Sequence, residues 1–329
     1  MDKILSLMVE QLAGNTRSKM KNLKEYGFNT DNKTYVIAEI GINHGGDLDL
    51  AKRMIDSASK TGCDAVKFQT YLTELRAPKG NQEVFDILKK CELPFSDFEI
   101  LKNHSQNYGL DFFSTPFDRE SVECLESIDV DLYKVASFDV VNKQLLRELA
   151  KTGKPIIMSV GMANLEEIRE AHAVIKTTSN NLAILHCISA YPTEEKDANI
   201  GAIRILQDEF SDCVIGQSDH TSGIKVPLYA VALGAQIIEK HFKIDDEMDC
   251  IDAPVSVTEE QLSDLVSNIR EIEKILGNGA IGFPDIACCH VGLESDAKAA
   301  FGCAALLGLV FDGLVPKTGE NGLGFVLEG

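Results

Sequence analysis

Two short polar segments, each following an apolar strand-like run, carry a histidine. Residues 218–221 (Ser-Asp-His-Thr) contain His220, and residues 239–242 (Glu-Lys-His-Phe) contain His241. A single histidine is more often a core or surface residue, but two on neighbouring strand ends can converge on one divalent metal ion. Mixed nitrogen and oxygen ligands suit Mn²⁺ or Mg²⁺, which can activate a carbonyl group as a Lewis acid. We predict that His220 and His241 bind the metal, with Glu39 as a third ligand or as a group that orients water.

Two lysines, Lys67 and Lys134, lie within strand-like runs. A buried lysine is costly unless it meets an anion. One interpretation places a phosphorylated or carboxylated ligand between the two ammonium groups, and the alternative is an internal ion pair with Glu39 or Glu239. Hydroxyl groups that could donate to the oxygens of such an anion follow other strands: Thr115, Ser137 and Ser218.

Short β-branched runs alternate with longer amphipathic segments from Tyr35 onward, which indicates a parallel sheet. Eight runs are predicted strands: 35–40, 65–69, 111–114, 132–136, 155–160, 182–187, 213–217 and 236–241. Eight strand–helix units match an α/β fold of the closed (β/α)8 TIM-barrel type, in which catalytic groups gather at the carboxyl ends of the strands. An open doubly wound sheet is the alternative, but residues 41–46 do not form the glycine-rich phosphate turn that usually follows its first strand.

Apolar residues at helical spacing predict helices between these strands. Among them are 142–152, 165–176 and 200–210. Asp49, Asn164 and Asn199 are predicted N-caps, and residues 258–261 (Thr-Glu-Glu-Gln) resemble a capping box. The longer excursion at 71–94 is expected to fold over the mouth of the barrel.

The composition narrows the class of protein. A net charge of −19 does not suit a nucleic-acid backbone or an anionic membrane surface, so neither is expected as a partner. No apolar run is long enough for a membrane span, and the N-terminal residues lack the apolar stretch of a signal peptide. The nine cysteines are odd in number and irregularly spaced, which predicts reduced thiols and a cytoplasmic protein without a disulfide framework.

Three regions are expected along the 329 residues. They are an extra N-terminal helical extension at 1–27, the catalytic barrel at 28–279 and a short, atypical C-terminal extension at 280–329. The last region is rich in Gly and Ala and shows little clear periodicity.

Seven motifs, in order along the chain, resemble those of the sialic acid (nonulosonic acid) synthases. They are 39–44 (EIGINH), 67–70 (KFQT), 114–117 (STPF), 133–137 (YKVAS), 186–193 (HCISAYPT), 218–221 (SDHT) and 239–242 (EKHF). Any one motif alone would be a weak signal, but seven in the family's order are specific. The resemblance runs from about Phe28 to Gly277 and implies a TIM barrel that condenses phosphoenolpyruvate with an amino sugar.

The activity implied by the resemblance joins phosphoenolpyruvate to an N-acylated hexosamine, either N-acetylmannosamine or a 2,4-diacetamido-trideoxyhexose. The products are a nine-carbon 2-keto acid and phosphate. A divalent metal, Mn²⁺ or Mg²⁺, polarises the open-chain aldehyde of the sugar, C3 of phosphoenolpyruvate attacks that carbon, and phosphate leaves by C–O cleavage. A homodimer is also expected.

The resemblance assigns roles to the matching positions. Glu39, Lys67 and Lys134 are expected to be catalytic, and His220 and His241 are expected to hold the metal. Phosphoenolpyruvate would contact Lys67, Thr115, Lys134, Ser137, Ser189 and Ser218. The sugar or the reacting centre would face Glu39, Gln69, Tyr191 and Asp252.

The chain departs from the family pattern in three places. Residues 249–254 (DCIDAP) share only Asp252 with the Gly-Pro-Asp-His string of the sialic acid branch, which leaves the sugar open. Ser189 stands where some members carry Asn. The Lys-Arg-Pro-Gly motif of the usual antifreeze-like domain does not occur, and residues 315–322 are at most a remnant of it. Two alternatives therefore stay open: a related carboligase that uses a phosphorylated aldose, and a non-catalytic sugar-binding barrel.

Overall fold

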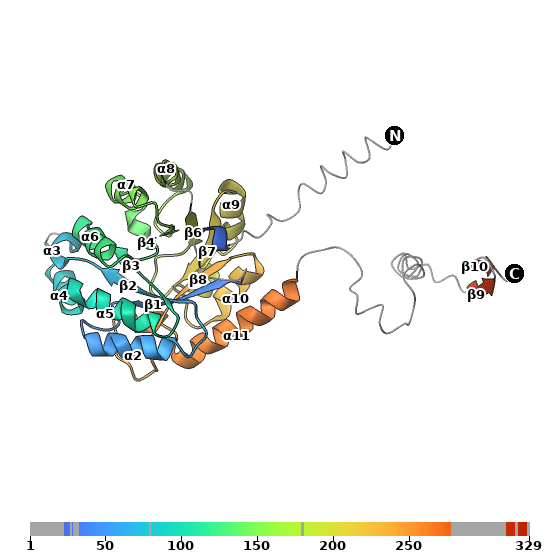
Figure 1. Ribbon diagram of the computed structural model, residues 1–329, viewed down its shortest axis with the longest axis horizontal. Coiled ribbons are helices and arrows are strands. Elements are labelled where there is room, and N and C mark those ends of the chain that lie inside the picture. Colours follow the sequence, from blue (N-terminus) through green and yellow to red (C-terminus); the bar gives the residue numbers. More distant parts are fainter. Residues whose placement is uncertain are drawn as a thin grey trace. The chain divides into compact units, whose positions relative to one another are not determined.

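The computed structural model describes residues 23–26, 28, 33–78, 80–178, 181–277, 314–319 and 322–327. Its main unit contains a closed barrel of eight parallel strands, each hydrogen-bonded to the next in chain order and β8 to β1 (Figure 1). The strands are β1 Tyr35–Gly41, β2 Ala65–Thr70, β3 Asp111–Pro116, β4 Tyr133–Val135, β5 Ile156–Ser159, β6 Leu182–His186, β7 Val214–Asp219 and β8 Ile237–His241. The expected (β/α)8 barrel is confirmed, and the strand bounds differ from the predicted ones by no more than a residue or two.

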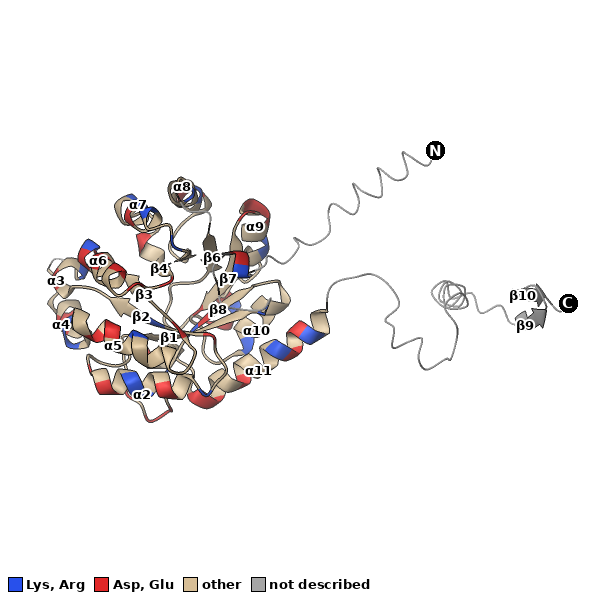
Figure 2. Ribbon diagram, in the orientation of Figure 1, with Lys and Arg blue, Asp and Glu red and all other residues tan. Residues whose placement is uncertain are grey.

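Helices surround this barrel (Figure 1). They are α2 Leu48–Ala58, α3 Thr73–Arg76, α4 Gln82–Cys91, α5 Phe95–Gln106, α6 Arg119–Ser127, α7 Lys143–Lys151, α8 Leu165–Lys176, α9 Ala202–Glu209, α10 Lys225–Ala232 and α11 Glu259–Leu276. Each long helix buries an apolar stripe against the sheet, as α7 does with Leu145, Leu146 and Leu149. Acidic and basic residues lie close together along α2 and α11 (Figure 2).

The inside of the barrel changes character along its axis because alternate residues of a strand share one face. On β1, Tyr35 and Ile37 belong to an apolar cluster, and Glu39 follows two residues later on the same face. The cluster comprises Phe28, Tyr35, Ile37, Ala65, Phe113, Leu132, Ile157, Ala183, Leu185, Val214 and Ile237. Apolar side chains thus fill the amino-terminal end of the barrel, so its charged inward groups collect at the carboxyl ends of the strands.

The helix caps are partly as expected. Asn164 caps α8 in a full capping box with Glu167, and Thr258 and Gln261 form reciprocal hydrogen bonds at the start of α11. The Asp49 cap is wrong: the Asp47 carboxylate accepts from the backbone N–H groups of residues 49 and 50, so the helix begins earlier.

The Asn199 cap is also wrong. Helix α9 begins at Ala202, with Gly201 at the N-cap position and no side-chain cap hydrogen bond. Asn199 instead adopts a positive φ of 44°, a left-handed conformation that short polar side chains tolerate. It is therefore part of the turn that precedes the helix.

The excursion at 71–94 folds back on the barrel through α3 and α4. The Tyr71 hydroxyl donates to the Leu88 carbonyl, and Gly46 packs so closely on the end of α4 that a Cβ there would lie 2.3 Å from the Lys90 carbonyl oxygen. The last residue of α3, Arg76, lines the pocket at the carboxyl ends of the strands. The segment reaches the mouth of the barrel through Arg76, in agreement with the expectation that it folds over the mouth.

The predicted terminal regions lie largely outside the described residues. Of the 1–27 extension, the turn of 3-10 helix η1 (Leu23–Tyr26) is described, and of 280–329 two antiparallel strands, β9 (Leu314–Gly319) and β10 (Gly322–Leu327). The limits of the three regions stay predictions. Within the described residues, no helix combines the length and apolar character needed to cross a bilayer.

Candidate active site

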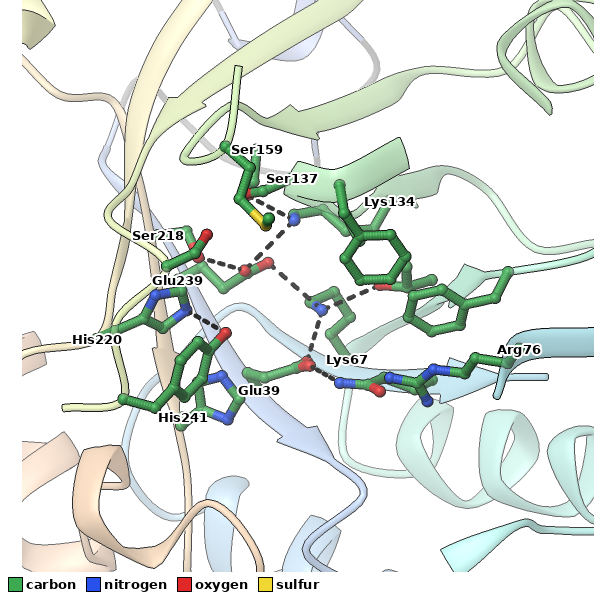
Figure 3. Close-up of a pocket in the computed structure, with 18 residues that line it drawn as sticks. Glu39, Lys67, Arg76, Lys134, Ser137, Ser159, Ser218, His220, Glu239 and His241 are labelled. Carbon is green, nitrogen blue, oxygen red and sulfur yellow. Dashed lines mark hydrogen bonds and ion pairs between the residues drawn. The ribbon is translucent and has the colours of Figure 1, made fainter. Parts of the chain in front are cut away.

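A cavity of about 260 Å³ opens at the carboxyl ends of the strands (Figure 3). All but one of the predicted site residues line it: Glu39, Lys67, Gln69, Thr115, Lys134, Ser137, Ser189, Tyr191, Ser218, His220 and His241. The exception is Asp252, which lies against His241, with its Oδ2 atom 3.3 Å from the imidazole Nδ1. The structure therefore brings the predicted residues to one place, while their individual roles stay predictions.

Strand register explains how residues far apart in sequence meet. Glu39 on β1 is paired with Lys67 on β2 and, on the other side, with His241 on β8. Ser218 on β7 is likewise paired with Glu239 on β8. Paired residues on parallel strands point to the same face, so these side chains all enter the barrel.

The two lysines share two buried carboxylates. Lys67 Nζ lies 2.8 Å from Glu39 Oε2 and 3.7 Å from Glu239 Oε2, and Lys134 Nζ lies 3.5 Å from Glu239 Oε1. The internal ion pairs of the second interpretation are present, and an anionic ligand between the lysines stays a prediction. The lysines form the internal ion pairs, yet they also line the cavity, where an ammonium group with three N–H donors can bind a further anion.

Hydroxyl groups complete this network. Lys67 donates to Thr115 Oγ1 at 3.2 Å, Lys134 donates to Ser159 Oγ at 2.7 Å, and Ser218 donates to Glu239 Oε1 at 2.8 Å. Ser137 Oγ accepts from the Gly161 backbone N–H at 3.0 Å. The floor of the cavity thus holds hydroxyl groups next to two cationic groups, which suits the oxygens of a carboxylate or phosphate.

The two carboxylates differ in their electrostatic surroundings. Burial raises the pKa of Glu39, and the neighbouring Glu239 charge adds to this against the opposing effect of Lys67. Burial also acts to raise the pKa of Glu239, but Lys134, Lys67 and the Ser218 hydroxyl outweigh it and lower that pKa. Glu239 is therefore the fixed anion of the network, and Glu39 is the carboxyl group better placed to exchange a proton.

The two histidines lie side by side, with ring centroids 5.5 Å apart. His220 Nδ1 donates to the Ile188 carbonyl at 2.7 Å, which leaves Nε2 with its lone pair directed towards the Tyr191 hydroxyl at 2.9 Å. Burial and the adjacent His241 lower the pKa of His220 to about 3, so its imidazole is neutral. A neutral imidazole whose second nitrogen is anchored to a carbonyl is the form that ligates metals.

His241 is buried, and its Nδ1 atom lies 3.3 Å from Asp252 Oδ2 without hydrogen-bond geometry. Burial acts to lower its pKa, but the charges of Asp252 and Glu39 together with the Asp252 contact outweigh this and raise the pKa. Two imidazoles, of which that of His220 is neutral, and two carboxylates lie on one side of the cavity and form a nitrogen–oxygen donor set. These residues fit a divalent cation of the Mn²⁺ or Mg²⁺ type.

A second group of potential ligands lies elsewhere in the described part of the chain. His172, Asp212 and Cys213 have donor atoms within 4.8 Å of one another, on α8 and on the segment that enters β7. This is the amino-terminal end of the strands, away from the cavity. Lys176 already neutralises Asp212 at 3.0 Å, which opposes cation binding there.

Several residues that line the cavity were not among the predicted site residues: Arg76, Phe117, Ala136, Phe138, Ser159, Met162 and Glu239. Ser159 and Glu239 stand at strand ends, so their position alone could have identified them. Arg76 lies on a short helix in an irregular segment, where no periodicity indicates which side chains turn inward.

Comparison with known proteins identifies the family. Residues 54–281 match the NeuB family. The N,N'-diacetyllegionaminic acid synthase of Campylobacter jejuni is 38% identical over 263 residues, which cover 75% of this chain and 78% of the relative. The N-acetylneuraminate-9-phosphate synthase of Mus musculus is 32% identical over 299 residues, covering 87% of this chain and 83% of the relative.

A solved structure agrees with these relatives. The N-acetylneuraminic acid (sialic acid) synthetase of Leptospira borgpetersenii, in complex with citrate, superimposes with a TM-score of 0.76 at 38% identity, covering 84% of this chain and 93% of the other. The resemblance drawn from the seven motifs is confirmed, and with it the expectation of a phosphoenolpyruvate-dependent synthase. The chain belongs to the NeuB family, together with synthases of sialic, legionaminic and pseudaminic acids.

Proposed function

We propose that this enzyme condenses phosphoenolpyruvate with an N-acylated hexosamine, either N-acetylmannosamine or a 2,4-diacetamido-trideoxyhexose. The products are a nine-carbon 2-keto acid and inorganic phosphate. The observation that carries the proposal is the meeting of Lys67, Lys134, His220 and His241 around one cavity. Two cations suited to an anionic substrate and two imidazoles suited to a metal are the groups that this chemistry requires.

The lysine side of the cavity would hold phosphoenolpyruvate. Lys67 and Lys134 would donate to its carboxylate and phosphate oxygens, and Thr115, Ser218 and Ser159 would add hydroxyl donors from neighbouring strands. Charge-assisted hydrogen bonds from buried donors also fix the orientation of the substrate, so that its C3 atom faces the opposite side of the cavity.

The histidine side would hold the aldehyde end of the open-chain sugar. His220, His241 and the carboxylate of Asp252 are the residues that would bind a divalent cation, which when bound supplies Lewis-acid activation of the aldehyde oxygen. The Tyr191 hydroxyl, now 2.9 Å from His220 Nε2, would then be free to contact the sugar.

The reaction forms one carbon–carbon bond and breaks one carbon–oxygen bond. C3 of phosphoenolpyruvate attacks the aldehyde carbon, the aldehyde oxygen takes up a proton, and water adds to C2. Glu39, with its raised pKa, is placed to take the proton from that water. The resulting C2 centre expels phosphate with its bridging oxygen, which leaves the 2-keto acid.

The test is a substrate panel. Phosphate release and product mass would be measured with phosphoenolpyruvate, Mn²⁺ and each candidate hexosamine, using phosphoenolpyruvate labelled with ¹⁸O at the bridging position. The proposal expects phosphate only when all three components are present, with the label in the phosphate. Label retained in the organic product would contradict C–O cleavage, and a full panel without phosphate release would contradict the proposed acceptor class.

We also propose a homodimer located in the cytoplasm. The cysteines at positions 63, 91, 124, 187, 213 and 250 are free thiols, which supports a reducing compartment. Analytical ultracentrifugation of the full chain tests the dimer, since a single monomer species at micromolar concentration would contradict it.

A further inference from the structure

The guanidinium group of Arg76 is a cation in the cavity without a carboxylate partner among the described residues. Lys67 and Lys134, the other cations lining the cavity, each have a glutamate oxygen within 4 Å. The Tyr71 hydroxyl interacts with Arg76, the carboxylates of Asp252, Asp139 and Glu39 act on it only from a distance, and its Nη1 atom is buried without a hydrogen-bond partner. Burying a cation without a partner is costly unless an anion completes the site.

Two aromatic rings hold this group in place. The Arg76 Cζ atom lies 3.9 Å from the centroid of Phe117 and 4.4 Å from that of Tyr71. Phe117 in turn stacks on Phe138, with centroids 5.6 Å apart and an angle of 14° between the rings. A guanidinium stacked on aromatic faces keeps its N–H edges free for hydrogen bonds, and its rotamer is already ordered before a ligand arrives.

Arg76 occupies a different part of the cavity from Lys134 and Ser159. Figure 3 shows it on the far side of Lys67 from the labelled serines, Ser137, Ser159 and Ser218. Burial lowers the pKa of Arg76, but an arginine still carries its charge at neutral pH. The cavity therefore offers a second, separate position for negative charge.

We propose that Arg76 is a substrate-binding residue that holds an oxyanion at this second position. The inference rests on the proposed function, because it assigns the oxyanion to one of the two substrates. It is either the carboxylate or phosphate of phosphoenolpyruvate reaching past Lys67, or a phosphoryl group carried by the sugar. The second source would place the enzyme among the synthases that take a phosphorylated acceptor.

Calorimetric titration of the full chain with Mn²⁺ distinguishes these sources without requiring turnover. The ligands are phosphoenolpyruvate, N-acetylmannosamine and N-acetylmannosamine 6-phosphate, and the variants are Arg76→Gln and Arg76→Lys. The loss of one charge-assisted contact is expected to weaken binding of the oxyanion ligand roughly tenfold to 100-fold in Arg76→Gln. Arg76→Lys keeps the charge but not the fork of N–H donors, so its loss is expected to be smaller.

Arg119→Gln is the matched control, because Arg119 lies on the surface of α6 in an exposed pair with Glu123. Weaker phosphoenolpyruvate binding in Arg76→Gln alone assigns the oxyanion to that substrate, and weaker sugar phosphate binding alone assigns it to the sugar. Affinities equal to those of Arg119→Gln for all three ligands would overturn the inference. Tight binding without phosphate release would contradict the proposed function instead, and leave the assignment of Arg76 standing.

Discussion

Two buried lysines from opposite faces of the same barrel show different uses of charge. Lys67 points into the cavity and shares two glutamates, with 4% of its side chain exposed. Lys240 points outward from β8, where its Nζ atom lies 2.6 Å from Asp219 Oδ2 and also donates to the Thr221 carbonyl, with none of its side chain exposed. Burial alone therefore does not distinguish a lysine that lines the cavity from one that is enclosed in a structural ion pair.

The two networks differ in how many hydrogen-bond donors and acceptors they leave free for a ligand. Asp219 also accepts from Thr221 and Gln217, so the outward pair is satisfied on both sides and buried. The inward network borders a cavity, and the His241 Nδ1 atom beside it contacts Asp252 at 3.3 Å without forming a hydrogen bond. The fully hydrogen-bonded pair of Lys240 and Asp219 joins β8 to β7. Charged groups that keep free donors or acceptors next to a cavity can instead bind a substrate.

The largest effect is expected when either imidazole of the cavity is removed. His220→Ala or His241→Ala removes a nitrogen donor from the side of the cavity that fits a divalent cation, so metal binding and turnover should both be abolished. The fold should persist because neither side chain belongs to the apolar cores. Metal content, phosphate release and circular dichroism are the measurements.

The second group of potential ligands, which comprises His172, Asp212 and Cys213, supplies the control for this experiment. His172→Ala removes a histidine from the cluster with Asp212 and should leave metal content and turnover unchanged. Full activity in His220→Ala or His241→Ala would refute the assignment of these residues as ligands.

The next largest effect distinguishes the two lysines. Lys67→Met should lower kcat/KM roughly 100-fold to 1,000-fold, as the loss of one preorganised donor to developing charge does. Stability should change much less, because Glu39 already has a raised pKa and can take up a proton when its partner is lost. Initial rates and urea unfolding measure the two effects, and a loss of stability as large as the loss of transition-state binding would make Lys67 a structural residue.

Lys240→Met should show the opposite pattern. It leaves Asp219 buried without its cation, which costs about 3–5 kcal/mol of stability in comparable cases. The double variant Lys240→Met with Asp219→Asn removes both charges and should recover part of that loss, since no uncompensated ion remains. Urea unfolding of the three proteins tests this. A single variant as stable as the wild type would show that the outward pair does not hold the strands together.

The barrel and most of the cavity could be predicted from sequence because both depend on the alternation of side chains between the two faces of each strand. Glu39, Lys67 and His241 are separated by long stretches of chain, yet each stands at the end of an apolar run, and parallel strands bring such ends together. The same alternation places Lys240 on the opposite face from Glu239 and His241, although its partner became clear only from the register between β7 and β8.

Arg76 could not be found in this way. Its position depends on the packing of an irregular segment, on the stacking of two aromatic rings and on the close approach of α4 to Gly46. None of these contacts has a periodic signal in the sequence. The wrong Asp49 cap has a related cause, since Asp47 and Asp49 compete for one helix start and only the backbone geometry decides between them.

The smallest expected effect comes from a charge cluster near solvent, outside both networks. Partial burial acts to raise the pKa of Asp212, but hydrogen bonds and charges from Lys176 and His172 outweigh it and lower that pKa to about 2. A carboxyl group with a depressed pKa stabilises the fold above its unfolded pKa of about 3.8, and this contribution is lost as the pH falls from about 4 to about 2. Because half of the Asp212 side chain is exposed, solvent screening keeps the effect small. Urea unfolding at pH 7 and pH 3 should therefore show that the free energy of unfolding falls slightly less with pH in Asp212→Asn than in the wild type. An effect as large as that of Lys240→Met would contradict the distinction between buried and exposed charge pairs.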